Sequence, residues 1–374
     1  MASSLASPAA LTAHPPPPCL VRPRTARAWR SRCPVPVAYH RQFLAPINRY
    51  RSSSATGSRS SAESGQSTIG NSSSSSRSKP SSSRKTKVTL KLTYLEINTW
   101  VWEVQEHGVG EEARPLRVLV DPVAAGNLDF GVPWLYDGAK KHPAVRAMGV
   151  DDLLLATTGP PDLLLITSGL DDHCHARTLA RLSAMAPDLP VVAAPSAERA
   201  LAALPFRRVT FLAPGQSAAV GRRVRVLAAP GPVWGPPWQR PENAYVLFFS
   251  GDGDDGGGEG EGLIYYEPHC VYDRRFLGEN SVRAEVVITP VVKQILPGNL
   301  AVVSGQEDAV ELAALLRARH VVSMNNGDLD AGGLLTRVIT TQGTTESFEA
   351  MMAESLPEVQ VPVATPGVPL CLEL

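Results

Sequence analysis

Cysteine, mid-chain histidine and long apolar runs are all scarce in this sequence. Only five of its 374 residues are Cys, and an odd number of these, Cys174, Cys270 and Cys371, lie beyond residue 87. This count gives no support to a disulfide framework. No apolar run reaches the roughly 18 residues of a membrane span, so we expect no membrane-spanning segment. No His lies between His175 and His269.

Acidic residues are nearly absent from the first 87 residues. Eleven Arg, three Lys and one Glu give this segment a net charge of 14 − 1 = +13. The whole chain has 36 basic and 36 acidic residues, so residues 88–374 carry 22 − 35 = −13. Nonspecific nucleic-acid binding needs an excess of Lys and Arg. The acidic main part therefore argues against nucleic acid as a partner.

Residues 1–87 have the composition of a targeting segment, rich in Ser, Ala, Pro and Arg and poor in acid. Their length and Ser content favour a chloroplast transit peptide, with the stroma as destination and the mitochondrion as the alternative. The Ser-rich run at 52–83 cannot bury enough apolar surface to fold, so we expect it to be disordered. A permanent basic arm is the other interpretation. The folded domain is predicted to span residues 88–374.

Beyond residue 87, short apolar runs alternate with a few helical segments. This mixture predicts an α/β or α+β class in which two sheets lie between helices. The expected strands are 88–104, 116–120, 163–166, 191–194, 209–212, 223–228, 244–249, 263–266, 286–289 and 320–324. The expected helices are 135–141, 175–185, 197–203, 307–319, 333–340 and 347–354.

Two segments between these elements have unusual compositions. Residues 251–262 consist of Asp, Glu and Gly, but Gly256 and Leu263 stand where a calcium loop needs oxygen ligands. We therefore predict a solvated hairpin loop. Residues 230–243 contain five Pro and two Trp. This segment is either a rigid surface loop whose Trp side chains pack on the core, or one wall of a pocket.

The densest group of reactive side chains follows the apolar run 163–166. There the sequence continues as Thr167-Ser168-Gly169-Leu170-Asp171-Asp172-His173-Cys174-His175. A strand end that delivers carboxylates, imidazoles and a thiol so closely is a ready place for a metal. Alternatively, Asp172 caps the following helix through its backbone N–H groups and His173 hydrogen-bonds in the interior. Cys174 at a helix start beside His suggests a nucleophile, although such a Cys more often packs inward.

This turn resembles the T-H-x-H-x-D-H motif of the metallo-β-lactamase superfamily, in its lactonase-like branch. Three further segments match landmarks of that family in the same order, and together the matches span roughly residues 90–345. They are Leu119-Val120-Asp121-Pro122 for L-x-D-P, residues 263–269 for I-Y-Y-S-G-D-T, and residues 321–327 for V-P-M-H-x-G. The nearest kin that this resemblance suggests is a plant or cyanobacterial metallo-hydrolase-like offshoot.

The resemblance implies an αββα sandwich with two metals at one edge, where the loops meet. In the family the first metal takes three His, but here Ser168 and Leu170 replace two of them and the mid-chain His is missing. A first metal is therefore effectively excluded. At the second metal, the bridging Asp corresponds to His269, or to Glu267 if the alignment slips. The last His corresponds to Asn325, a weak oxygen ligand.

The resemblance thus leaves one metal at most. Asp172, His173 and His269 form the expected two-His, one-carboxylate set for a single Zn²⁺ or Fe²⁺. Cys270 or His175 are candidates to complete it. The alternative is a degenerate site that holds no metal.

Two functions follow as hypotheses. The first is a non-catalytic plastid protein that uses this fold to bind a small ligand or a protein partner, and the degraded ligand positions favour it. The second is a single-metal hydrolase of a small ester, lactone or phosphoester, with Asp172 and His173 as catalytic residues. Tyr265 and Tyr266 either alternate between the core and the outside of their strand or donate a hydrogen bond to an oxyanion.

Overall fold

Two mixed β-sheets form the centre of the described chain. The computed structural model describes residues 87–107, 114–155, 158–233, 240–249 and 262–374. The first sheet has seven strands in the order β18-β1-β2-β3-β5-β6-β7, and the second has six in the order β15-β12-β11-β10-β9-β8. In each sheet, antiparallel pairs on one side give way to parallel pairs on the other.

The first sheet contains β1 (Val88–Tyr94), β2 (Trp100–Glu106), β3 (Leu116–Val120), β5 (Leu163–Ile166), β6 (Val191–Ala193), β7 (Val209–Phe211) and β18 (Leu370–Glu373). The second contains β8 (Ser217–Val220), β9 (Val224–Pro230), β10 (Asn243–Phe249), β11 (Gly262–Tyr266), β12 (Ala284–Pro290) and β15 (His320–Met324). Two small sheets contain β4 (Asp137–Ala139) with β16 (Asp330–Gly332), and β13 (Lys293–Leu296) with β14 (Leu300–Val303) and β17 (Thr340–Gln342). The helices are α1 (Pro143–Ala147), α2 (Val150–Leu154), α3 (Ala176–Met185), α4 (Glu198–Leu201), α5 (Arg274–Glu279), α6 (Gln306–Leu316) and α7 (Thr345–Ser355).

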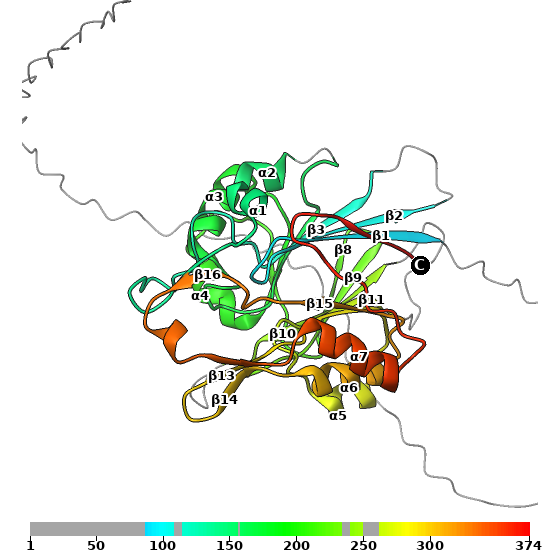
Figure 1. Cartoon of the computed structure of the whole chain (residues 1–374). Coiled ribbons are helices and arrows are strands. Elements are labelled where there is room, and N and C mark those ends of the chain that lie inside the picture. The colour runs from blue at the N-terminus through cyan, green and yellow to red at the C-terminus, as the bar shows by residue number, and fades with distance from the viewer. Residues whose placement is uncertain (1–86, 108–113, 156–157, 234–239, 250–261) are drawn as a thin grey trace, which may run out of the picture. The chain divides into compact units, whose positions relative to one another are not determined.

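Helices cover the outer face of each sheet. On the first sheet, Leu164 of β5 packs in one apolar cluster with Leu179 of α3 and with side chains of α1, α2 and α4. On the second, Val287 of β12 packs with Leu312 of α6 and with side chains of α5 and α7. The inner faces of both sheets share the central core, which includes the fully buried Trp102. Figure 1 shows the helices on opposite sides of the two sheets. The predicted αββα sandwich is confirmed.

The parallel strands bring their following turns to one edge. β3 pairs in parallel with β5, and β11 pairs in parallel with β12. The chain leaves β3 at Asp121, β5 at Thr167 and β11 at Glu267. In open α/β sheets, ligands bind outside the carboxyl ends of such strands. The residues that follow these three strands therefore lie where a ligand site forms in such folds.

The predicted strand 88–104 is two strands joined by a tight turn. Glu96 and Ile97 both have positive φ, at 61° and 56°, and reverse the chain between β1 and β2. Such backbone usually calls for Gly, Asn or Asp, so the residue types at these two positions did not mark the turn. On β11, Tyr265 and Tyr266 do alternate, but both are fully buried because helices cover the outer face of the sheet as well.

Two predicted helices, 135–141 and 333–340, are wrong. β4 pairs antiparallel with β16, and beyond this pair Leu334 N and Leu335 N donate to the carbonyls of Trp134 and Leu135. The second segment continues as a short 3₁₀ turn and then β17. Backbone pairing between distant segments has thus outweighed a weak local helical periodicity, which is a common failure of sequence patterns.

Several predictions concern residues outside the described part. These are the transit peptide, the Ser-rich run, residues 251–261 of the acidic loop, and the two Trp of the Pro-rich segment. The predicted domain start at residue 88 also stays a prediction. Among the described residues, no helix is both long and apolar enough to cross a membrane.

Candidate metal centre

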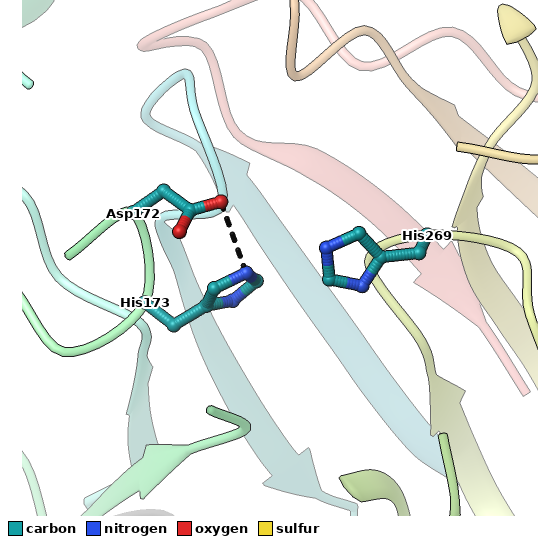
Figure 2. A group of neighbouring side chains, drawn as sticks. All are labelled: Asp172, His173 and His269. Atoms are coloured by element: carbon teal, nitrogen blue, oxygen red, sulfur yellow. Dashed lines mark ion pairs between the residues drawn. The ribbon is translucent and has the colours of Figure 1, made fainter. Parts of the chain in front are cut away.

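Three predicted ligands meet at the edge where β5 and β11 end. Asp172 and His173 come from the turn between β5 and α3, and His269 comes from the turn after β11. One potential ligand atom from each residue lies within 4.8 Å of the other two. Figure 2 shows the His269 ring facing the Asp172 carboxylate and the His173 ring. Within the described residues, this is the one group of three or more His, Cys, Asp or Glu side chains with such spacing.

His173 is held from behind by Asp121. The imidazole is fully buried, and its Nδ1 lies 3.0 Å from Asp121 Oδ2 and 2.9 Å from Thr167 Oγ1. Its Nε2 lies 3.1 Å from Asp172 Oδ2. A carboxylate behind the ring fixes the orientation of a metal-binding His and makes the other nitrogen a better ligand. Nε2 is therefore the nitrogen available to a cation.

The electrostatic setting of His173 already favours a positive charge. Burial alone would lower the pKa of His173, but the carboxylates of Asp172 and Asp121 raise it well above its ordinary value. Conversely, burial opposes ionisation of Asp172, but the neighbouring His173 dominates and lowers the pKa of that carboxyl. A proton and a metal cation compete for the same lone pair, so a site that attracts the one also attracts the other.

Asp172 points into the group and does not cap α3. It is Asp171 whose Oδ1 accepts from Ala176 N at the start of α3, at 3.2 Å. Asp172 Oδ1 is buried without any hydrogen-bond partner. The Asp172 side chain is 20% exposed, whereas the side chains of His173 and His269 are 0% and 8% exposed. Solvent therefore reaches the group from the side of Asp172.

Two glutamates surround His269. Its Nδ1 lies 3.3 Å from Glu267 Oε1 and 3.4 Å from Glu242 Oε2. Burial alone would lower the pKa of His269, but these carboxylates raise it above the usual value. Glu267 also accepts from the backbone N–H of His269 at 3.0 Å. These contacts fix the turn that carries His269.

Glu242 is a site residue that the sequence did not reveal. It lies at the end of the Pro-rich segment, just before β10, and is buried. Its Oε1 accepts a hydrogen bond of 2.8 Å from Ser168 Oγ, whereas its Oε2 is buried without a hydrogen bond. Burial raises the pKa of Glu242. A single Glu among prolines carries no recognisable motif, so only the fold could show its proximity to His269.

The other reactive side chains do not join the group. His175 turns toward α3, where its Nδ1 lies 2.7 Å from Thr178 Oγ1. Burial raises the pKa of Cys174 to about 12, which disfavours a reactive thiolate. Cys270 is also buried, and burial raises its pKa as well. Asn325 is exposed, and its neighbour Asn326 approaches the centre instead.

The donors present suit a small hard or borderline cation. Imidazole nitrogen and carboxylate oxygen are ligands of Zn²⁺ and of Fe²⁺. Buried carboxylate oxygens without a hydrogen bond are costly, and two of them, Asp172 Oδ1 and Glu242 Oε2, lie at this centre. A divalent cation would offset that cost. The residues present therefore fit one metal ion.

A family model and several solved structures match this chain. The family described as "Beta-lactamase superfamily domain" matches residues 91–325. The isothiocyanate hydrolase from Delia radicum gut bacteria is similar in structure, with a TM-score of 0.50, 15% identity, and coverage of 76% of this chain and 100% of that chain. Igni18, a metallo hydrolase from Ignicoccus hospitalis, has a TM-score of 0.47, 18% identity, and coverage of 76% and 99%. The metallo-β-lactamase fold protein YhfI from Bacillus subtilis has a TM-score of 0.47, 11% identity, and coverage of 76% and 100%. No curated protein matches the sequence.

Proposed function

The chain belongs to the β-lactamase superfamily domain family, and on this premise we propose that it is a hydrolase that works with one divalent cation, zinc or iron. The cation would be held by Asp172, His173 and His269, and the substrate would be a small ester, lactone or phosphoester. One observation supports this above all: three potential ligand atoms lie within 4.8 Å of one another beside two buried carboxylate oxygens that have no hydrogen bond. Placement in the lactonase-like branch is part of the same proposal.

The bound cation would supply Lewis acidity at the reacting oxygen atoms. Glu242 is the candidate general base. Ser168 holds its Oε1 at 2.8 Å, so Oε2, which lies 3.4 Å from His269 Nδ1 without a hydrogen bond, is the oxygen left to take a proton from the attacking water. Burial raises the pKa of Glu242, and a carboxylate with a raised pKa is a better proton acceptor. Asp121 holds the His173 ring in place at 3.0 Å while this happens.

A second function, ligand binding without catalysis, is supported by the replaced positions. Ser168 uses its hydroxyl to hold Glu242, and Leu170, without a donor atom, is 40% exposed. The three-ligand group thus stands alone where relatives with the intact motif are expected to hold two metals. A centre that has lost one of its metals can keep the fold and a ligand pocket without the original chemistry.

Metal analysis and a hydrolysis panel separate these functions. The purified full chain should contain about one equivalent of zinc or iron. Asp172→Ala should lose it, and the neighbouring Asp171→Ala should keep it as the matched control. The parent should hydrolyse an aryl ester, a lactone or an aryl phosphoester. Glu242→Gln should keep the metal but lose about 10²–10⁴-fold in rate.

Each outcome decides a point. A parent without bound metal after reconstitution would overturn the proposal. A metal-loaded parent that turns over none of the three substrate classes would favour the non-catalytic function. Two equivalents of metal, both lost in Asp172→Ala, would show that the remaining ligands of a two-metal site lie elsewhere.

A further inference from the structure

A fourth side chain, Asn98, lies against the three-residue group. It belongs to the turn between β1 and β2 and is 1% exposed. Its Nδ2 lies 3.3 Å from Asp172 Oδ2 and 3.2 Å from His173 Nε2, so it contacts a potential ligand atom of each residue. The same nitrogen lies 3.3 Å from the Asp172 backbone oxygen.

The spacing of these atoms matches corners of a metal site. Asp172 Oδ2, His173 Nε2 and the Asn98 amide form a triangle with sides of 3.1, 3.2 and 3.3 Å. Ligand atoms about 2.0–2.1 Å from a tetrahedral Zn²⁺ lie about 3.3 Å apart. The Asn98 amide therefore occupies the place of a further ligand, next to two others.

A chain of side-chain amides determines whether the oxygen or the nitrogen of the Asn98 amide faces Asp172 and His173. Gln294 Nε2 donates to Asn326 Oδ1 at 3.1 Å, and Asn326 Nδ2 donates to Pro268 O at 2.9 Å. The same Asn326 Nδ2 donates to Asn98 Oδ1 at 3.0 Å. These contacts turn the Asn98 NH₂ toward Asp172 and His173. An NH₂ group has no lone pair for a metal, but half a turn of the amide exchanges it for the carbonyl oxygen at the same place.

The backbone that positions Asn98 is conformationally strained. Ile97, a β-branched residue, has a φ of 56°, a genuine outlier for its type. Tyr94 Oη donates to Ile97 O at 3.0 Å, and Tyr266 Oη donates to Asn98 O at 2.9 Å. The core thus holds the turn in a strained shape. Such strain tends to persist where a functional site needs the residue that follows it.

We propose that Asn98 is a fourth protein ligand of the single cation. Without a cation, its NH₂ donates to Asp172 and stands beside His173; with one, the amide turns and its Oδ1 binds the ion. This assignment rests on the proposed cation site but not on hydrolysis. It also gives Asn326 a role, because the hydrogen bond from Asn326 opposes the turn and so lowers the affinity for the cation.

Two nearly isosteric variants of the full chain test this ligand. Asn98→Asp places a carboxylate oxygen in the corner, and Asn98→Leu removes every ligand atom. The probes are Zn²⁺ in competition with a chelator of known affinity, and Co²⁺, whose visible absorption reports the coordination geometry. Asn98→Asp should bind at least about tenfold more tightly than the parent, because an added carboxylate strengthens a cation site. Asn98→Leu should bind about tenfold more weakly and change the Co²⁺ spectrum.

A measurement on the parent guards against variants that fail to fold. The Asn98 side-chain NH₂ resonances, assigned by their loss in a conservative Asn98→Gln variant, should shift when Zn²⁺ is added to one equivalent. Unshifted resonances, or equal Zn²⁺ affinity in the parent and both variants, would overturn the assignment. If the parent binds no cation but Asn98→Asp binds one, position 98 lies where a ligand can reach the ion, but both the proposed function and the assignment of Asn98 fail. If neither binds, both proposals fall.

Discussion

Replacing Asp121 with Asn should weaken cation binding without touching a ligand. The Asp121 carboxylate is fully buried, accepts from Thr167 N at 2.9 Å and faces His173 Nδ1 at 3.0 Å. A carboxylate can only accept hydrogen bonds, so it requires a proton on Nδ1. With that nitrogen protonated, the lone pair of Nε2 is the one available to the cation.

The expected loss follows from a change of tautomer. The new amide has nearly the same shape, and Asn tolerates the φ of 42° at this position. Its oxygen can still accept from Thr167 N, which turns its NH₂ to His173 Nδ1. That nitrogen must then accept, and in a neutral ring the proton moves to Nε2. Losing such a support typically costs about 10–100-fold in metal affinity, or about 1.4–2.7 kcal/mol.

Zinc competition against a chelator of known affinity measures this change. The control is Thr167→Val, because Thr167 Oγ1 also lies 2.9 Å from His173 Nδ1 but carries no charge. The control should lose about 1 kcal/mol of stability from its missing hydrogen bonds and keep most of its zinc affinity. If the Asp121→Asn variant bound zinc as tightly as the parent, that result would refute the argument, since His173 would then not bind the cation through Nε2.

Two further predictions concern regions away from the centre. Burial lowers the pKa of Lys140, which is 8% exposed, to about 8, with the Glu96 carboxylate partly opposing; because the unfolded chain holds this proton up to about 10.5, the free energy of unfolding should rise between pH 8 and 10.5. Lys140→Met should remove that rise and stabilise the protein at pH 7 by on the order of 2–3 kcal/mol. The measurement is urea unfolding of parent and variant at a series of pH values; if the free energy of unfolding changed with pH equally in both, the prediction would be contradicted. The mature N-terminus in plastids should lie between about residue 40 and residue 87; terminal-peptide mass spectrometry that finds an intact Met1 there would reject the transit peptide.

The strands that support the centre were readable from the sequence because they are mostly apolar, and β5 is an unbroken apolar run. β3, β5 and β15 have the predicted bounds. All four residues of β5 are buried, since one face meets the core and the other meets the helices. Parallel strands buried on both faces read as unbroken Val, Ile and Leu, and their ends are therefore sharp. The turn that carries Asp172 and His173 could be located for the same reason.

Two residues at the centre could not be found this way. Glu242 precedes β10, and Asn98 follows a turn whose two left-handed residues are Glu96 and Ile97. Neither stands in a metal-binding spacing with another ligand. Their importance comes from contacts across long stretches of chain, 2.8 Å from Ser168 to Glu242 and 3.2 Å from Asn98 to His173. A local pattern has no access to such contacts, whereas His269 could be proposed from the family landmarks.

The charges at the centre explain how it can be stable with or without a metal. Its ionisable groups within direct contact are four carboxyl groups, Asp121, Asp172, Glu242 and Glu267, and two imidazoles, His173 and His269. With formal charges, four carboxylates and two protonated imidazoles sum to −4 + 2 = −2. Four carboxylates, two neutral imidazoles and one divalent cation give the same sum. One cation can therefore replace two protons without changing the net charge that the fold must bury. A second cation would find no imidazole at Ser168 or Leu170, and it would have no further imidazole protons to replace, so the net charge would change.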